Sequence, residues 1–307
     1  MSDKRTFKTS WSGQRGYRKQ RGIALLVVLW LSLLLTVVAA GVAYNSQVEG
    51  LLTRRAVDRV SLLAAANAGI QMAVYQLRHP NPKFRLWADG RPYSKEFEGV
   101  DLIIRIEDES GKLGLNRVSQ EQLKKLFVSA GAEEKQADSL ADAVLDYRDA
   151  DDLVRVHGAE QADYEAAGLM SGPRNAQFLV LDELLQVYGM NYQLYQKVAP
   201  ALSVHSQNPT PDLRLAPREV LMMEPGVTEE FVDMFLQARY GETSISAALP
   251  TWPGGKQLGV FRGRGPVFNI EVTAMTPNNL TSRIRAVVDT ERKSRFAPFT
   301  VLRWDEY

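Results

Sequence analysis

The chain has 307 residues, of which 45% are hydrophobic and 24% are charged, a composition typical of globular proteins. Collagen-like, mucin-like and wholly disordered chains are therefore excluded, and the length predicts about two domains. The 37 Lys and Arg residues balance the 36 Asp and Glu residues, so the net charge of +1 gives no overall reason to expect nucleic-acid binding. Because the chain has no cysteine, disulfides, thiolate catalysis and cysteine-based metal sites are excluded.

Charge is distributed unevenly at the N-terminus. Against the single acid Asp3, residues 1–22 contain the basic residues Lys4, Arg5, Lys8, Arg15, Arg18, Lys19 and Arg21. Residues 23–44 carry no charge, and a helix of that length, at ~1.5 Å per residue, measures about 33 Å. Such a helix can cross the ~30 Å hydrocarbon core of a membrane, with the basic flank in the cytoplasm and the bulk of the chain on the other side.

Gly22 lies between the basic segment and the apolar run. A cut after Gly22 would remove the basic leader and leave Ile23 as the first residue. This arrangement resembles the processing site of type IV pilin-like proteins, where a prepilin peptidase cuts after glycine on the cytoplasmic side. The alternative, an ordinary secretory signal, is disfavoured because its apolar region spans only ~7–15 residues, and the small residues at 38–41 have no helix-breaking neighbour.

The apolar run continues into an amphipathic segment. No proline occurs from Asn45 to Leu77, so we predict one helix from about Ile23 to about Arg78, ended by Pro80 and Pro82. Apolar residues recur at helical spacing along one stripe, and those expected to contact partners are Val48, Leu52, Val60, Leu63 and Ile70. A single-pass anchor with a juxtamembrane coiled coil is the alternative, although the stripe lacks a clean heptad.

The rest of the sequence predicts an α+β fold. Alternating and β-branched residues predict strands at 100–106, 267–272, 282–288 and 299–304. Turn signals precede the first strand at residues 89–92 and join the second to the third at 277–279. Residues between these strands predict helices at 121–130, 133–148, 181–188 and 228–238. We therefore expect a pilin-like long N-terminal helix packed on a small antiparallel sheet, with a large all-helical insertion.

The expected organisation has six parts. They are a cytoplasmic leader at 1–22, a transmembrane helix at 23–44, the amphipathic part of the same helix at 45–80, a first β region at 81–116, an inserted helical domain at 117–260 with lobes at 117–205 and 206–260, and a second β region at 261–307.

Four strings in this organisation resemble one known family. They are Asp108–Asn116 at the junction of strand and helix, Asp146–Asp152, Gly158-Ala159-Glu160 with Tyr164, and Leu181–Leu184. Over nearly its whole length the chain resembles the K-type minor pseudopilin of type II secretion systems. Two departures bear on local loops: residues 212–217 are not the usual Asn-rich stretch, and Tyr147 stands where the family often has Trp.

The resemblance implies a function and a location. It implies an inner-membrane precursor that is cut after Gly22, methylated on Ile23 and extracted into a short periplasmic filament. The implied partners are the I-type and J-type minor pseudopilins, the major pseudopilin, the prepilin peptidase and membrane lipid. Most pilins carry Glu at the fifth mature residue, where it offsets a neighbour's N-terminal amine. Here that position is Val27, and no acid occurs until Glu49. A subunit of this kind is expected to cap the pseudopilus tip and help initiate assembly for export of folded proteins.

An acidic stretch is the best candidate for a binding site. Six side chains could converge if the loop after Asp149 folds back, and they are Asp146, Asp149, Asp151, Asp152, Glu160 and Asp163. Clustered hard oxygen ligands suit Ca²⁺, although the spacing is not that of an EF-hand. The alternative interpretation is a solvated acidic face.

Other functions are disfavoured. We find no Walker A string, no Gly-x-Ser-x-Gly elbow and no His-Glu-x-x-His, so a membrane-anchored periplasmic enzyme lacks a catalytic constellation. The turn at residues 225–227 resembles a helix-hairpin-helix, but acids surround it, so we expect no nucleic acid as a partner. A minor pilin of a type IV pilus shares the long helix and the processing site and remains the main alternative.

Overall fold

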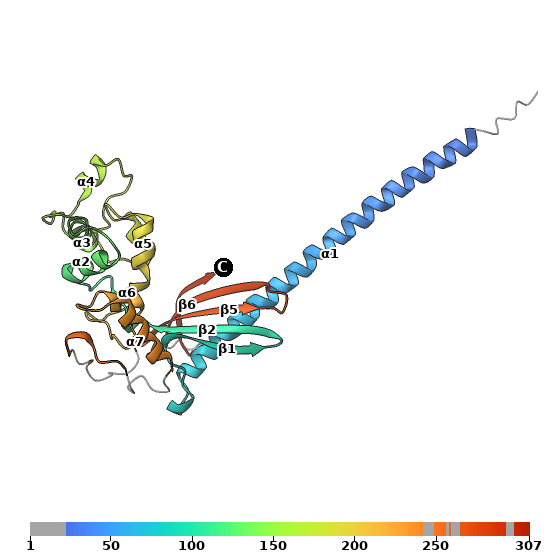
Figure 1. Ribbon diagram of the computed structural model, residues 1–307. Coiled ribbons are helices and arrows are strands. Elements are labelled where there is room, and N and C mark those ends of the chain that lie inside the picture. The colour runs from blue at the N-terminus through green and yellow to red at the C-terminus, as the bar shows by residue number, and fades with distance from the viewer. Residues whose placement is uncertain (1–22, 242–248, 256–257, 259–264, 293–297) are drawn as a thin grey trace, which may run out of the picture. The chain divides into compact units, whose positions relative to one another are not determined.

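The computed structural model describes residues 23–241, 249–255, 258, 265–292 and 298–307 (Figure 1). The chain divides into two compact units, one ending at Asp58 and the other spanning Arg59–Tyr307. The predicted leader, including Gly22, lies outside the described residues, as do parts of the predicted second lobe.

Helix α1 runs from Ile23 to Leu77 without interruption, which confirms the predicted long helix. It is long and apolar enough to cross a membrane, with a mean hydropathy of 2.8 in its most apolar part. All residues from Ile23 to Val57 are exposed, and exposed apolar side chains in such number are typical of a contact surface or a membrane segment.

Five antiparallel strands form the main sheet, in the order β1-β2-β5-β6-β7. Their bounds are Asp89–Phe97, Val100–Asp108, Val267–Met275, Thr281–Asp289 and Thr300–Glu306. Strand β2 ends beside the start of β5, because Asp108 pairs with Phe268. The middle region therefore leaves the sheet at the end of β2 and returns to it at the start of the neighbouring strand β5. The predicted α+β class is confirmed.

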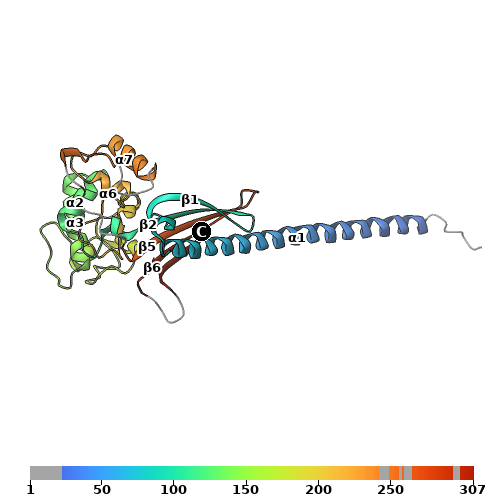
Figure 2. The same cartoon turned by 90° about the horizontal axis from the view of Figure 1, so that it is seen from below.

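Residues 59–77 of α1 pack on one face of this sheet (Figure 2). The buried helix residues recur every three or four positions: Leu62, Ala65, Ala66, Ile70, Ala73, Val74 and Leu77. Alternate strand residues face them, as the two-residue period of a strand requires, and include Ile104, Ile270, Val272 and Ile284. Gly69 allows the closest approach, since a Cβ there would lie 2.7 Å from Cγ1 of Val272.

The turn that precedes β2 is not at residues 89–92, as the sequence suggested. Asp89–Phe97 is itself a strand, and the turn lies at Glu98 and Gly99, whose φ angles are 51° and 78°. Two consecutive positive φ angles are typical of the tight hairpin turn that matches strand twist. Pro92 is tolerated within β1 because β1 is an edge strand.

The middle region is mainly helical, with its own core. Its helices are α2 (Gln120–Ser129), α3 (Glu134–Arg148), α4 (Gln161–Ala166), α5 (Tyr192–Val198), α6 (Arg218–Met222) and α7 (Glu229–Gly241). Short 3₁₀ turns occur at η1 (Pro82–Phe84), η2 (Glu109–Gly111), η3 (Leu181–Gln186), η4 (Ala199–Ala201) and η5 (Pro253–Gly255). Two residue pairs, β3 (Leu113–Gly114) and β4 (Leu202–Ser203), add a small parallel ladder. The predicted α-helix at 181–188 is instead the shorter η3, because Val180 and Val187 on either side of it are extended.

Buried polar contacts fasten the middle region at its junction with the sheet. Asp108 accepts hydrogen bonds from the N–H groups of Ser110 and Gly265, at 2.9 and 2.8 Å. The ammonium group of Lys112 lies 2.9 Å from carboxylate oxygens of both Glu107 and Glu109. The entry to the middle region and the exit from it are therefore tied to the same end of β2.

Candidate functional site

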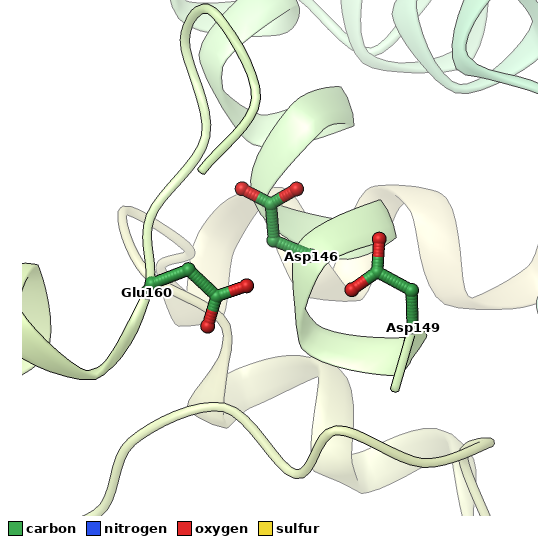
Figure 3. Close-up of side chains that lie close together, drawn as sticks. All are labelled: Asp146, Asp149 and Glu160. Carbon is green, nitrogen blue, oxygen red and sulfur yellow. The ribbon is translucent and has the colours of Figure 1, made fainter. Parts of the chain in front are cut away.

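Three carboxylates from the predicted acidic stretch lie together (Figure 3). Asp146 is in the last turn of α3, Asp149 is the residue that ends this helix, and Glu160 directly precedes α4. One carboxylate oxygen from each residue lies within 4.8 Å of the others. The chain between α3 and α4 must therefore fold back over the end of α3.

Two hydrogen bonds from main-chain N–H groups of this loop to aspartates of α3 stabilise the folded-back conformation. Asp146 Oδ2 accepts the main-chain N–H of Arg155 at 3.2 Å, and Asp142 Oδ2 accepts that of His157 at 3.2 Å. Asp142 and Asp146 are one helical turn apart on α3, so both point toward the same loop. Gly158 completes the contact, because a Cβ there would lie 1.9 Å from Asp146 Oδ2. Only a residue without a side chain fits between the loop and Asp146.

The cluster contains oxygen atoms without a hydrogen-bond donor. Asp146 is fully buried and Glu160 is 4% exposed. Among the described residues, no donor is aligned for a hydrogen bond with either oxygen of Glu160, Oδ1 of Asp146 or Oδ1 of Asp149. Asp146 Oδ1 is balanced only by an ion pair, with Arg155 Nε at 3.1 Å. Buried carboxylate oxygens normally have partners, since leaving them without one costs free energy. These orphaned oxygens fit a hard divalent cation, for which carboxylate oxygens are the preferred ligands.

The electrostatics of the cluster support the same interpretation. Burial, reinforced by the charges of Asp146, Asp149, Asp152 and Asp151, raises the pKa of Glu160 to about 7. Burial also raises the pKa of Asp146, and the neighbouring Asp149 adds to this effect. Three carboxylates confined in this way repel one another, and a bound cation would relieve the repulsion.

The other three predicted ligands have different partners. Asp151 accepts the N–H of Leu153, Asp152 accepts the side-chain amide of Asn175, and Asp163 accepts the N–H of Glu160. These contacts shape the loops around the cluster. The structure therefore groups Asp146, Asp149 and Glu160, while Asp151, Asp152 and Asp163 are held by neighbouring main-chain and amide groups.

Sequence reasoning missed three residues at this site. Asp142 and Gly158 position the loop, and Arg155 forms ion pairs with Asp146 and Asp149. The four-residue spacing of Asp142 and Asp146 could have indicated the first, but nothing in the sequence alone indicates that Gly158 and Arg155 fold back to meet α3.

The predicted residues of the long helix differ in exposure. Ile23 is the first described residue of α1, and Val27 is 54% exposed. Val48, Leu52 and Val60 are exposed, and Leu63 is half-buried. The prediction that Ile70 contacts a partner is wrong. Its side chain is fully buried against the sheet of its own chain, because the apolar stripe turns inward where the helix meets the strands.

The region that contains the acidic cluster also matches a known protein family. Residues 106–207 match the family model described as type II secretion system (T2SS), protein K. Relatives in three bacteria carry the same family name. The chain belongs to the type II secretion system protein K family. The matched range includes Asp146, Asp149 and Glu160, so the acidic cluster lies within the part of the chain that fits the family model.

The individual protein K relatives are distant from this chain in sequence. The chain is 26% identical to type II secretion system protein K of Pseudomonas aeruginosa, over 70% of this chain and 72% of that protein. It is also 26% identical to a protein K of Escherichia coli strain K12, over 61% of this chain and 63% of that protein. For the protein K of Pectobacterium carotovorum the shares are 59% and 62%, again at 26% identity. The matched region thus spans somewhat less than two thirds of two of these relatives.

A solved structure has the same fold. In the GspK-GspI-GspJ complex from enterotoxigenic Escherichia coli, one chain superimposes on this one with a TM-score of 0.56 and 16% sequence identity. The superposition covers 83% of this chain and 99% of that chain. The long helix, the sheet and the helical middle region together are therefore a protein K architecture.

Proposed function

We propose that this protein K is the minor pseudopilin that caps the tip of a periplasmic pseudopilus and helps to initiate its assembly. The observation that carries the proposal is the absence of any acid in α1 from Ile23 until Glu49. In an apolar filament core, a carboxylate near the N-terminus offsets the amine of a neighbouring subunit, a charge that is costly to leave unpaired. A subunit without this carboxylate is acceptable at an end of the filament and unsuitable for its repeating shaft.

The exposed apolar part of α1 supports assembly with partner helices. Leu51, Leu52, Val57 and Val60 are each more than half exposed, although they belong to the same stripe that is buried farther along the helix. An apolar surface of this kind marks a contact site. The GspK-like fold was solved in a complex with GspI and GspJ, so the I-type and J-type minor pseudopilins are the proposed partners. Further proposed partners are the major pseudopilin, the prepilin peptidase and membrane lipid.

The proposed location is the bacterial inner membrane, with the N-terminus in the cytoplasm and residues after the transmembrane segment in the periplasm. Cleavage after Gly22 and methylation of Ile23 are part of this proposal. Replacing Gly22 with Val should leave the basic leader attached and block secretion of the folded cargo. Mass measurement of the protein from secreting cells tests this, and full secretion with the leader still attached would contradict it.

The proposed role is structural and not enzymatic, in keeping with a family named for a secretion apparatus. Membership of the protein K family also favours a secretion pseudopilus over a type IV pilus. Imaging of pseudopili labelled on this subunit tests the tip position directly. We expect label at one end of each filament, and label spaced along the shaft would refute the capping role.

We also propose that the acidic cluster binds Ca²⁺. Asp146, Asp149 and Glu160 would hold the ion, which would neutralise the cluster and cross-link the end of α3 to the start of α4. Calorimetry of the full chain in detergent micelles, with Ca²⁺ and then a chelator, tests this. Glu160→Gln should weaken binding at least tenfold, whereas Glu121→Gln, at an exposed ion pair on α2, should leave binding unchanged. Equal binding to the two variants would contradict this assignment.

A further inference from the structure

Arg155 already faces two carboxylates of the acidic cluster. Its Nε lies 3.1 Å from Asp146 Oδ1, and its Nη2 lies 3.2 Å from Asp149 Oδ2. The chain therefore supplies its own counter-ion to two of the three acids. The Arg155 side chain is 45% exposed, so the guanidinium can move into solvent when it leaves the carboxylates.

Asp146 is the residue at which the guanidinium and a metal ion would compete. Its Oδ2 accepts the main-chain N–H of Arg155, which holds the carboxylate in the loop contact. Among the described residues, no donor is aligned for a hydrogen bond with its Oδ1, which is therefore the atom left for a cation. The same Oδ1 faces Arg155 Nε. A divalent cation at ~2.4 Å from this oxygen would lie close to the guanidinium, where two positive charges in a buried setting repel strongly.

A guanidinium cannot join the coordination shell instead of leaving. It carries only N–H donors and has no lone pair to offer a metal ion. Arg155 also occupies Asp149, whose Oδ2 accepts a hydrogen bond from Nη2 at 3.2 Å. Removing Arg155 would therefore free both aspartates for a cation.

We propose that Arg155 and a divalent cation exchange at this cluster. The guanidinium leaves Asp146 and Asp149 when the cation binds and returns to them when the cation is removed. This inference rests on the cation site proposed above. The exchange would change the conformation of the loop that carries Arg155. That loop also contains Leu153, Val154 and Val156, which are 76%, 54% and 89% exposed. Occupancy of the site is thereby coupled to the conformation of an apolar surface loop.

Calorimetry with Ca²⁺ on the full chain in detergent micelles tests the exchange. Arg155→Ala removes the competitor and should tighten Ca²⁺ binding by about two- to fivefold, the size expected for loss of one partly exposed ion-pair partner. Arg155→Lys cannot face both aspartates as Arg does, and its affinity should fall between the two. Lys125→Ala is the matched control, since it removes one positive charge at an exposed ion pair on α2; its affinity should equal that of the wild type.

The outcomes distinguish failure of the Arg155 exchange from failure of the Ca²⁺ site itself. Absence of binding to every variant would overturn the cation site and the exchange together. Binding to the wild type with equal or weaker binding to Arg155→Ala would overturn the exchange alone, and would mean that Arg155 supports the carboxylates without competing.

A second measurement follows the guanidinium itself. In arginine-labelled protein, the Nε–Hε signal of Arg155 is identified by its loss in Arg155→Lys. We expect Ca²⁺ to move this signal to the position of a solvated arginine in proportion to site occupancy, and a chelator to restore it. A signal that stays in place while calorimetry records binding would refute the exchange.

Discussion

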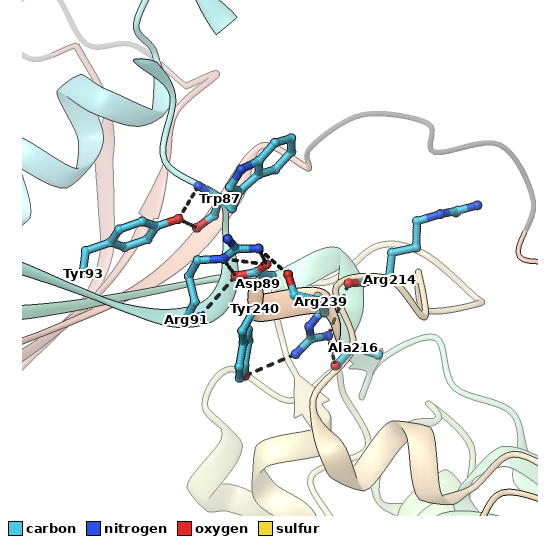
Figure 4. A network of polar contacts seen from close by, with 8 residues as sticks. All are labelled: Trp87, Asp89, Arg91, Tyr93, Arg214, Ala216, Arg239 and Tyr240. Carbon is cyan, nitrogen blue, oxygen red and sulfur yellow. Dashed lines mark hydrogen bonds and ion pairs between the residues drawn. The ribbon is translucent and has the colours of Figure 1, made fainter. Parts of the chain in front are cut away.

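Arg91 on β1 donates a hydrogen bond through Nη2 to the main-chain carbonyl of Arg239 on α7, at 2.6 Å (Figure 4). Arg91 is itself oriented by an ion pair with Asp89, at 2.7 Å. Arg239 is 2% exposed and donates in turn to the carbonyl of Ala216, at 2.7 Å, while its guanidinium lies over the ring of Tyr240. Two arginines thus link an edge strand of the sheet to the last helix of the middle region.

We expect Arg239→Ala to destabilise the helical region through loss of the Arg239 side chain, while the main-chain carbonyl that accepts from Arg91 is retained. The substitution leaves the buried carbonyl of Ala216 without its donor and removes a packed side chain, at a cost of about 1–3 kcal/mol. Denaturant unfolding of the full chain in detergent measures the loss, and hydrogen exchange should speed up in α6 and α7. Arg218→Ala is the matched control, because Arg218 pairs with Asp233 at an exposed site; its effect should stay below ~1 kcal/mol. Equal effects of the two variants would contradict a structural role for the Arg239 side chain.

Gly69 predicts a second effect on stability, at the contact between α1 and the sheet. In an exposed helix, Gly→Ala stabilises by up to about 1 kcal/mol. Here the added methyl group would lie 2.7 Å from Val272 Cγ1, so Gly69→Ala should instead destabilise by about 1–3 kcal/mol. Gly50→Ala, where a Cβ meets no atom within 4 Å, should be neutral or slightly stabilising. Thermal unfolding distinguishes the two variants, and an unchanged Gly69→Ala protein would mean that the helix can shift away from the strand.

The elements of the fold could be predicted because their signals are local. Residues 23–77 combine an apolar run with helical spacing and contain no proline. Strands β2 and β5, and the first half of β6, alternate in the sequence as they alternate in burial. Strand β1 lies within the predicted first β region, but its start at residues 89–92 was assigned to a turn because Gly90 and Pro92 are turn residues in most settings. Its edge position, which no local pattern reveals, makes both acceptable.

The site could be predicted only in part, because its geometry depends on contacts between distant residues. The acidic composition indicated the cluster, but it could not separate Asp146, Asp149 and Glu160 from acids that cap turns or bind amides nearby. Ile70 follows the same apolar stripe as Val60, and only the position of the sheet decides that one is buried and the other exposed.

Gly158 predicts a specific loss at the acidic cluster. Gly158→Ala would place a methyl group 1.9 Å from Asp146 Oδ2, so the carboxylate or the loop must move. We expect Ca²⁺ affinity to fall at least tenfold in calorimetry, with the sheet unaffected. Gly241→Ala, where a Cβ meets no atom within 4 Å, is the control and should bind as the wild type does. Unchanged affinity in Gly158→Ala would exclude the fold-back of this loop as a requirement for binding.

Glu160 predicts how stability and calcium binding depend on pH. Its pKa of about 7 in the folded chain lies above its ordinary value of 4.5, so the folded state binds more protons between these two pH values. The contribution of Glu160 to the stability of the metal-free protein is therefore fully present below pH 4.5 and is lost as the pH rises through about 7. Calcium binding requires the ionised form and should strengthen over the same range.

Unfolding of the metal-free protein and of its Glu160→Gln variant between pH 5 and 8 separates this contribution from other groups. The stability difference, wild type minus variant, should decrease with increasing pH, and Ca²⁺ should reverse the trend for the wild type only. A difference that does not change across this range would show that Glu160 does not titrate there.

Val27 predicts where the subunit can enter a filament. Placing a carboxylate at this position, by Val27→Glu, supplies the partner that a neighbouring N-terminal amine otherwise lacks in the apolar core, where an unpaired charge is costly. We expect labelled Val27→Glu protein to be found along pseudopilus shafts as well as at their ends. Val27→Gln, of similar shape but without charge, is the matched control and should remain at the ends. If both variants stay at the ends, the helical middle region, and not the missing carboxylate, excludes this subunit from the shaft. If both enter the shaft, neither feature restricts it to the tip.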